Sequence, residues 1–325
     1  MKIMTAQRIR RLRYYSKAIA EMVCVPDGIY RSRLKRKLET LSEYDRSAVF
    51  DRVNYYNQQT APFSVTPAAP RLADLPFWRK TMSYYDYRAI MRHFPVELRA
   101  DLNFEDVHYA LPAPTFTKSR PIGESGANCV LLKLRKVRQY HPIIDRIPFE
   151  EKKNRLVWRG AAWQPHRKAF LRGHWNHPLY DVGHVGEARE DIPREWIRDR
   201  MSIREQLRYK FVLSMHGTDI ATNLKWIAQS NSLCFMTKPR VEDWFMEGRL
   251  VAGTHYVELR DDYADLPEKV EHYLQHPDEA KAIIANFQAW HRPFTDRGQE
   301  ELVGLLVALK YFDRSGQFSV PGVFQ

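Results

Sequence analysis

The sequence predicts an α/β protein in which parallel strands alternate with helices. From residue 209 onward, apolar stretches of strand length alternate with amphipathic stretches of helix length. The expected strands are 209–217, 232–237 and 254–259, and the expected helices are 218–231, 241–250 and 266–274. Short helices that connect short apolar strands are typical of a parallel sheet with helices on its faces.

The loop 217–223 is the first candidate for a phosphate site. Gly217 closes the first predicted strand, and Thr222 and Asn223 are expected to cap the helix that follows. Parallel sheets bind ligands beyond the carboxyl ends of their strands, where helix N-termini direct backbone N–H groups outward. We therefore expect this loop to hold an anionic group.

A second anion site is predicted upstream. The run RLVWRG is a strand that ends in Arg159 and Gly160, and it leads into a helix with Arg167 in its first turns. Arginine offers paired donors that match the oxygens of a phosphate. The alternative is that both arginines form structural salt bridges.

The amino-terminal sixty residues are the most basic part of the chain. Two helices are predicted, over 3–23 and 29–41. Their cations are Arg8, Arg10, Arg11, Arg13 and Lys17 in the first helix and Arg31, Arg33, Lys35, Arg36 and Lys37 in the second. Such helices either lie on an anionic membrane surface or present a solvated face, and both alternatives remain open.

The remaining segments surround the predicted sheet. Residues 61–76 are rich in proline and form either a linker or a loop draped over a domain. A short helix is predicted over 83–95, followed by short strands separated by prolines. Two helices are predicted near the carboxyl terminus, over 276–294 and 296–316, and the last could pack back on the first domain.

The composition limits the class of protein. A chain of 325 residues is long enough for two domains, and it has no apolar run near the ~18 residues of a membrane-spanning helix. Cys24, Cys129 and Cys234 lie far apart and are expected to be buried thiols of a cytosolic protein. The formal charge of +12 indicates an anionic partner, which could be nucleic acid, a membrane surface or an acidic glycan.

Two features between residues 102 and 123 could carry chemistry. Asp106 is expected at the end of a short apolar strand, where a carboxylate could accept a proton from a hydroxyl. A lone aspartate in a loop is also a common turn former. Lys118, Ser119 and Arg120 precede a Pro-Ile-Gly turn and suit an acceptor or phosphate contact.

No metal site is predicted. His174, His177 and His184 share one polar segment, but no pair has the spacing of ligands on a helix and no cysteine lies near. The chain also has no Walker, GxGxxG, HExxH or GxSxG motif, which removes the usual support for nucleotide hydrolases, dehydrogenases, zinc proteases and esterases.

Several long motifs resemble a known family. They are APTFTKSRPIG, KNRLVWRGA, QLRYKFVLSMHGTDIATNLKWIAQSNSLCFM, EDWFMEGRLVAGTHYVELRDDYADLPEKV and KYFDRSGQ, in that order along the chain. Together they look like the bacterial lipopolysaccharide-modifying branch of glycosyltransferase family 90. The family also includes capsule-associated xylosyltransferases and protein O-glucosyltransferases.

The resemblance implies a GT-B fold, in which two Rossmann-like domains face each other across a cleft. The resemblance covers about residues 83–317. After the basic helical segment at 1–60, we expect an acceptor-side domain at 61–150 and a donor-binding domain at 151–295, with helix 296–316 at the end. It also implies inverting transfer from a UDP-sugar with no metal and no other cofactor.

The resemblance also implies the site residues. The donor contacts are Trp158, Arg159, Gly160, Arg167, Gly217, Ala221, Thr222 and Asn223, with Glu242, Trp244 and Phe245 near the ribose and sugar. Animal relatives place an arginine at the position of Asn223, so Arg159, Arg167, Lys225 or a helix dipole must supply charge at the diphosphate. Asp106 best fits the catalytic base, with Glu105 as the neighbouring carboxylate.

These implications predict a cytoplasmic hexosyltransferase, peripheral on the inner face of the inner membrane, that acts on the core oligosaccharide of lipopolysaccharide. Its expected partners are a UDP-hexose, the core acceptor and the anionic membrane surface. The alternatives are transfer to a capsule or protein acceptor, a basic nucleic-acid-binding protein, and a sugar-binding module without activity.

Overall fold

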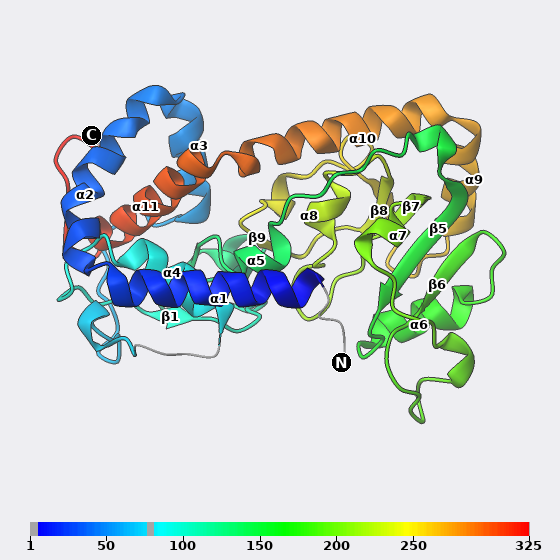
Figure 1. Ribbon diagram of the computed structural model, residues 1–325, viewed down its shortest axis with the longest axis horizontal. Helices are drawn as coiled ribbons and strands as arrows, with labels where there is room; N and C mark the ends of the chain where they lie inside the picture. The colour runs from blue at the N-terminus through cyan, green and yellow to red at the C-terminus, as the bar shows by residue number, and fades with distance from the viewer. Residues whose placement is uncertain (1–5, 77–80, 325) are drawn as a thin grey trace. The chain divides into compact units, whose positions relative to one another are not determined.

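A computed structural model describes residues 6–76 and 81–324 (Figure 1). The chain forms two compact units. The first takes in Met1–Tyr140, Val241–Trp244 and Phe294–Gln325, and the second takes in His141–Arg240 and Phe245–Pro293. Each unit has its own sheet and its own buried side chains.

The second unit contains a five-stranded sheet in which every neighbouring pair is parallel. Its strands are β5 (Lys153–Gly160), β6 (Tyr180–His184), β7 (Tyr209–Leu213), β8 (Leu233–Thr237) and β10 (Val257–Leu259). The strand order is β10-β8-β7-β5-β6. Because β6 lies on one side of β5 and the later strands lie on the other, the order reverses between β5 and β7. In doubly wound sheets, ligands bind beyond the carboxyl ends of the strands at this switch point.

Helices connect these strands and cover the sheet. They are α6 (Pro165–His174), α7 (Ile203–Gln206), α8 (Leu224–Ile227), α9 (Leu266–Gln275) and α10 (Pro277–His291). A single apolar cluster joins strand residues such as Leu156, Phe211 and Phe235 to Leu266 of α9 and Ile283 of α10. The strands predicted at 232–237 and 254–259 and the helices predicted at 266–274 and 276–294 are confirmed.

The helix predicted over 218–231 is wrong in length and in its cap. β7 ends at Leu213, residues 214–223 form a loop, and α8 comprises four residues. The Asn223 side chain does not cap α8. Its amide Nδ2 donates to the carbonyl oxygen of Leu213 at 2.9 Å, and its Oδ1 accepts from the Ser214 hydroxyl at 3.1 Å. The asparagine thus ties the loop to the end of β7.

The helix predicted over 241–250 is also wrong. Residues Val241–Asp243 form strand β9, which pairs antiparallel with β3 (Ser119–Pro121) in the first unit. Only Glu247–Arg249 make a 3₁₀ turn, which follows Met246 in the left-handed backbone conformation. A valine with bulky neighbours suits a strand, and Gly248 disfavours a helix.

The first unit combines helices with a small parallel sheet. The helices are α1 (Ala6–Cys24), α2 (Asp27–Glu39), α3 (Arg46–Tyr56), α4 (Met82–Met91), α5 (Lys136–Gln139) and α11 (Arg297–Arg314). The sheet has the order β1-β2-β4, with strands Leu102–Asn103, Thr115–Thr117 and Cys129–Leu131. The helix α11 is almost wholly buried from Leu302 to Phe312 and contacts α3, α4 and β4.

The structure tests the predictions made for the helices and the cysteines of the first unit. The helices predicted at 83–95 and 296–316 are confirmed as α4 and α11. Cys129 is buried, as Cys234 is in the second unit, but the expectation of a buried thiol is wrong for Cys24, which is exposed at the end of α1. The described residues include no helix long and apolar enough to cross a membrane.

Candidate active site

Arg167 occupies the switch point of the second unit. It lies in the first turn of α6, and its guanidinium makes three hydrogen bonds to backbone carbonyl oxygens. Nη1 donates to Ala161 at 2.9 Å, Nη2 to Met215 at 2.7 Å and Nε to His216 at 2.9 Å. Ala161 directly follows β5, and Met215 and His216 follow β7. The arginine therefore links the carboxyl ends of the two strands between which the strand order reverses.

Arg167 is a half-buried cation with neutral partners. Within residues 6–76 and 81–324, no carboxylate forms an ion pair with it. Burial lowers its pKa to about 10, and the nearby Tyr263 only partly opposes this effect. A desolvated cation without a counter-ion is costly, and a bound anion would offset that cost.

The other cations predicted for the diphosphate are neutralised inside the second unit. Arg159 forms an ion pair with Asp181 of β6, and it also donates to the carbonyl oxygen of Asp181 at 2.6 Å. Lys225 is fully buried, and its Nζ lies 2.6 Å from a carboxylate oxygen of Glu247. The dipole of α8 has little to contribute, since α8 is a single turn. Arg167 is thus the predicted source that keeps an uncompensated charge.

The Asp181 carboxylate holds the end of β5 in place. Burial would raise its pKa, but hydrogen bonds from Tyr209 and Arg159 outweigh burial and lower the pKa below its ordinary value. Asp181 therefore stays ionised at neutral pH, and Arg159 is fixed at the surface of β5 by a partner on the neighbouring strand.

Gly160 and Gly217 lie on either side of Arg167 in the chain. A Cβ at Gly160 would stand 2.7 Å from the ring of Trp158, so only glycine fits there. A Cβ at Gly217 would stand 3.7 Å from Nη2 of Arg167, which places this loop residue beside the guanidinium. Trp158 is buried, with its ring 5.8 Å from the Arg167 guanidinium carbon.

The other residues of the predicted donor loop, 217–223, differ in how far they are buried. Ala221 is buried, Thr222 is exposed, and Asn223 is half-buried in the hydrogen bonds to β7. The structure thus brings Gly217, Arg159 and Arg167 to one end of the sheet, while Lys225 points into the core.

Asp106 in the first unit lies in a basic environment. It follows the two-residue strand β1 by three positions and is therefore in a loop, not at a strand end as predicted. Its carboxylate forms an ion pair with the buried Lys118, and Nη1 of Arg135 lies 3.3 Å away. Burial alone would raise the pKa of Asp106, but Lys118, Arg135 and Arg138 outweigh burial and lower it. The side chain is 37% exposed, so an ionised carboxylate is accessible to a ligand.

The neighbours of Lys118 hold the first unit together. The Ser119 hydroxyl donates to the carbonyl oxygen of Val107 at 3.0 Å. Nε of Arg120 donates to Glu242 across the β3–β9 pair at 2.7 Å, and both side chains are buried. Arg120 and Glu242 therefore form a structural ion pair rather than an open phosphate contact.

Trp244 and Phe245 are also core residues. The Trp244 ring stacks on Tyr56 at 3.8 Å, and its Nε1–H donates to Glu300 at 2.7 Å in the first unit. Phe245 packs on Phe287 in the second unit. Both side chains are buried, so they support the backbone of this segment and are not exposed to a ligand.

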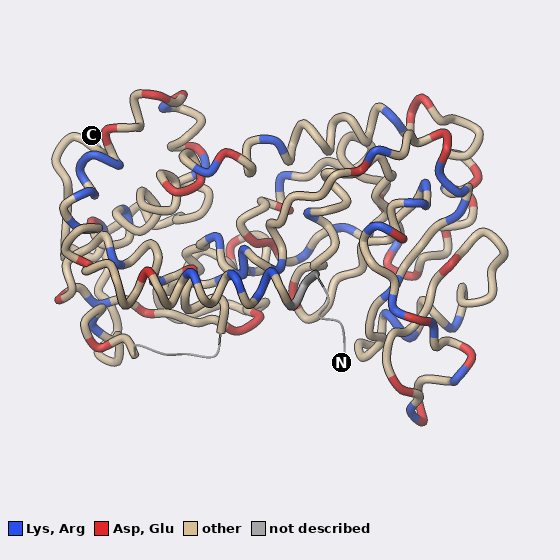
Figure 2. Tube along the Cα trace, in the orientation of Figure 1, with Lys and Arg blue, Asp and Glu red and all other residues tan. Residues whose placement is uncertain are grey.

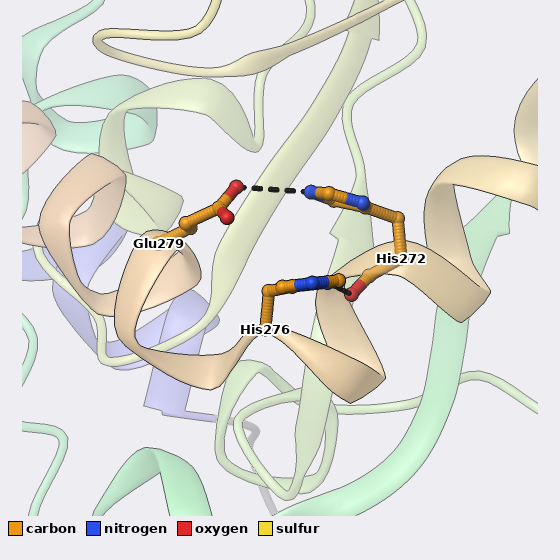
Figure 3. A group of neighbouring side chains, drawn as sticks. All are labelled: His272, His276 and Glu279. Atoms are coloured by element: carbon orange, nitrogen blue, oxygen red, sulfur yellow. Dashed lines mark hydrogen bonds and ion pairs between the residues drawn. The ribbon is translucent and has the colours of Figure 1, made fainter.

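One group of possible metal ligands occurs among the described residues. His272, His276 and Glu279 are exposed, and their ligand atoms lie within 4.8 Å of one another (Figure 3). They stand at the junction of α9 and α10. Lys281 of α10 pairs with Glu150, just before β5 begins, so this junction is at the amino-terminal end of the strands. The group is therefore at the opposite end of the sheet from Arg167.

Comparisons with known proteins agree with this architecture. The model of glycosyl transferase family 90 matches residues 107–293. A protein described as O-glucosyltransferase LpsA of Dichelobacter nodosus is 48% identical over 269 residues, which cover 82% of this chain and 83% of that protein. The family model matches more than half of the chain, and the similarity to the relative extends over most of it. The chain therefore belongs to glycosyltransferase family 90 and is a glycosyltransferase.

Proposed function

We propose that the protein transfers a hexose from a UDP-sugar to a hydroxyl of the lipopolysaccharide core, with inversion and without a metal. The observation that carries the proposal is the half-buried Arg167 at the switch point of the second unit, which no carboxylate of the described residues neutralises. The relative described as an O-glucosyltransferase makes glucose the first sugar to test. The strongly basic composition suits an acceptor that carries phosphates and acidic sugars.

In this proposal the second unit binds the donor and the first unit supplies the base. The ionised Asp106 accepts the proton of the acceptor hydroxyl as its oxygen attacks the anomeric carbon. The bond from that carbon to the diphosphate breaks on the opposite face, and negative charge develops on the departing UDP. Arg167 stabilises this charge, and its hydrogen bonds to the carbonyl oxygens of Ala161 and Met215, which follow β5 and β7, hold it in position before the reaction.

Calorimetric titration tests the donor assignment. UDP and a panel of UDP-sugars are titrated into the protein in the presence of EDTA. We expect UDP and UDP-glucose to bind with micromolar affinity. In a transfer assay, glucose from UDP-glucose should be transferred to core oligosaccharide. Absence of binding by every uridine nucleotide would overturn the donor, and transfer only to a capsule or protein acceptor would overturn the acceptor. A nucleic-acid-binding protein would instead bind RNA or DNA with a steep dependence on salt.

The helix α1 carries the proposed contact with the membrane. Exposed apolar residues recur along one face of α1, at Ile9, Leu12, Ala20 and Val23. Figure 2 shows the cations gathered toward its amino-terminal half. The opposite face is attached to α4, since the Tyr14 hydroxyl donates to Asp86 at 2.9 Å. An apolar stripe flanked by cations is the pattern of a helix that lies in the surface of an anionic membrane.

Leu12→Glu should weaken binding to phosphatidylglycerol vesicles by about tenfold or more. The substitution replaces an apolar side chain that would enter the membrane with a negative charge that the anionic lipid surface repels. Leu12 is 57% exposed, so the change leaves the core intact. Co-sedimentation with vesicles measures the effect. Ile144→Glu is the matched control, since Ile144 is 76% exposed on the second unit. Equal binding by wild type and Leu12→Glu would contradict the assignment.

A further inference from the structure

The first unit contains a cationic groove outside the candidate active site. It has a volume of about 640 Å³ and lies between α3, α11 and the segment that follows α11. Figure 1 shows these elements side by side near the carboxyl terminus. Three cations line the groove: Arg46 of α3 and Lys310 and Arg314 of α11. The described residues that line it include no carboxylate.

Lys310 is a buried cation with neutral partners. It is 5% exposed, and its Nζ donates to Oδ1 of Asn54 and to the carbonyl oxygen of Asn57, both at 2.7 Å. An ammonium group has three N–H donors, so these two bonds leave one for a ligand. Burial and the charge of Arg314 lower the pKa of Lys310 to about 8.

The two arginines are not neutralised either. Nη2 of Arg46 donates to the carbonyl oxygen of Val323 at 3.0 Å, and its guanidinium lies over the ring of Phe50. Nε of Arg314 is buried without a hydrogen-bond partner. Neither arginine has a carboxylate partner within the described part of the chain. Three such cations in one groove repel one another, and a bound anion would relieve that repulsion.

Elsewhere the first unit neutralises its buried cations. Arg52 of α3 and Lys133 share the carboxylate of Glu300 on α11, and Arg120 pairs with Glu242. By contrast, among the described residues Lys310 of α11 donates only to the side-chain oxygen of Asn54, two residues after Arg52, and to the carbonyl oxygen of Asn57, which follows α3. The unpaired charge is therefore a property of this groove and not of the unit as a whole.

We propose that this groove binds a sugar-borne phosphate, with Lys310, Arg314 and Arg46 on the phosphate oxygens. The amide side chains of the lining, such as Asn54 and Gln58, suit sugar hydroxyls, and the rings of Phe50 and Phe324 offer an apolar face to the sugar. Binding here does not depend on the transfer reaction, so its failure would leave the proposed function untouched.

Sulfate is the probe for the anion site, because it remains a dianion and takes up no proton near neutral pH. At constant ionic strength, calorimetry should show sulfate binding about tenfold weaker at pH 9 than at pH 7, since the protonated fraction of a lysine with a pKa of about 8 falls tenfold over that range. The other charged groups that line the groove are Arg46 and Arg314, which stay protonated throughout. The pH dependence is therefore specific to Lys310.

Variants separate the groove from general charge. Lys310→Met should abolish sulfate binding, and Lys310→Arg should retain it without the pH dependence. Arg297→Gln is the matched control, since Arg297 is an exposed cation at the other end of α11 and should bind sulfate as wild type does. Thermal unfolding reports whether each variant folds. If Lys310→Met does not fold, the pH profile of sulfate binding by Lys310→Arg tests the proposal by itself.

Glucose 6-phosphate identifies the sugar part of the ligand. It should bind more tightly than sulfate in wild type and lose that binding in Lys310→Met. The proposal is overturned by unchanged sulfate binding in Lys310→Met, by a pH profile that persists in Lys310→Arg, or by glucose 6-phosphate binding no better than sulfate.

Discussion

Arg167→Met should reduce kcat/KM for the donor by about 100- to 1,000-fold, the cost of removing one fixed donor from a developing oxyanion. The substitution keeps a long apolar side chain against Trp158 but removes the one predicted cation that no carboxylate neutralises. Calorimetric titration with UDP should show a parallel loss of affinity, because the diphosphate is charged before and after transfer. Arg167→Lys keeps the charge but cannot reproduce the three hydrogen bonds of the guanidinium, so it should recover only part of the affinity for UDP.

Two variants serve as controls for this effect. Lys168→Met changes the next residue of α6, whose ammonium pairs with Asp191 on the surface, and should bind UDP as wild type does. Arg159→Met removes a cation that Asp181 already neutralises. We expect it to lower stability more than UDP affinity, since Asp181 is left without its partner. UDP binding that survives Arg167→Met but is lost in Arg159→Met would show that the diphosphate site lies elsewhere.

The secondary structure of the second unit was largely predictable, because most of its strands and helices are indicated by local sequence patterns. The strand β8 is apolar up to its last residue, as expected for a strand buried on both faces, and β7 and β10 are apolar apart from Lys210 and Glu258. The amphipathic periods of α9 and α10 were equally clear. Arg159 was placed at a strand end, and Arg167 in the first turns of the next helix, for the same reason, since the end of an apolar run can be seen in the sequence.

What the sequence could not show is which cations are neutralised. Glu247, the partner of Lys225, lies 22 residues further along the chain, and Asp181, the partner of Arg159, also lies 22 residues away. Neither acid stands at a helical spacing from its cation, so no local pattern signals the pair. Only the folded sheet distinguishes Arg167 from the other cations that the sequence offered.

The segment 241–250 was misjudged for a related reason. Acidic residues at its start imitate the first turn of a helix, but its actual partner is β3, which lies more than a hundred residues earlier. A strand that pairs so far along the chain takes its structure from that partner, and tertiary contacts override local preference. The burial of Glu242 and Trp244 follows from the same pairing.

Asp106→Asn should lower kcat by about 10²- to 10⁴-fold, the usual contribution of a general base, and leave UDP affinity unchanged. An amide cannot accept the proton of the acceptor hydroxyl, whereas the proposed donor site in the second unit is not altered. Glu105→Gln is the matched control, because Glu105 is the exposed carboxylate beside Asp106. A large loss in Glu105→Gln with normal turnover in Asp106→Asn would move the base to Glu105.

The pH profile of Lys118→Met distinguishes a base from a structural carboxylate. In wild type the ion pair with Lys118 helps to hold the pKa of Asp106 below its ordinary value, so kcat/KM should fall only in strongly acidic buffer. Burial favours the neutral form of Asp106, so removal of the Lys118 ammonium raises the pKa of Asp106. Because the base must be ionised to act, the acidic limb of the profile should move to higher pH in Lys118→Met. A limb that stays in place while the rate falls would mean that Asp106 only holds Lys118 and the loop in position.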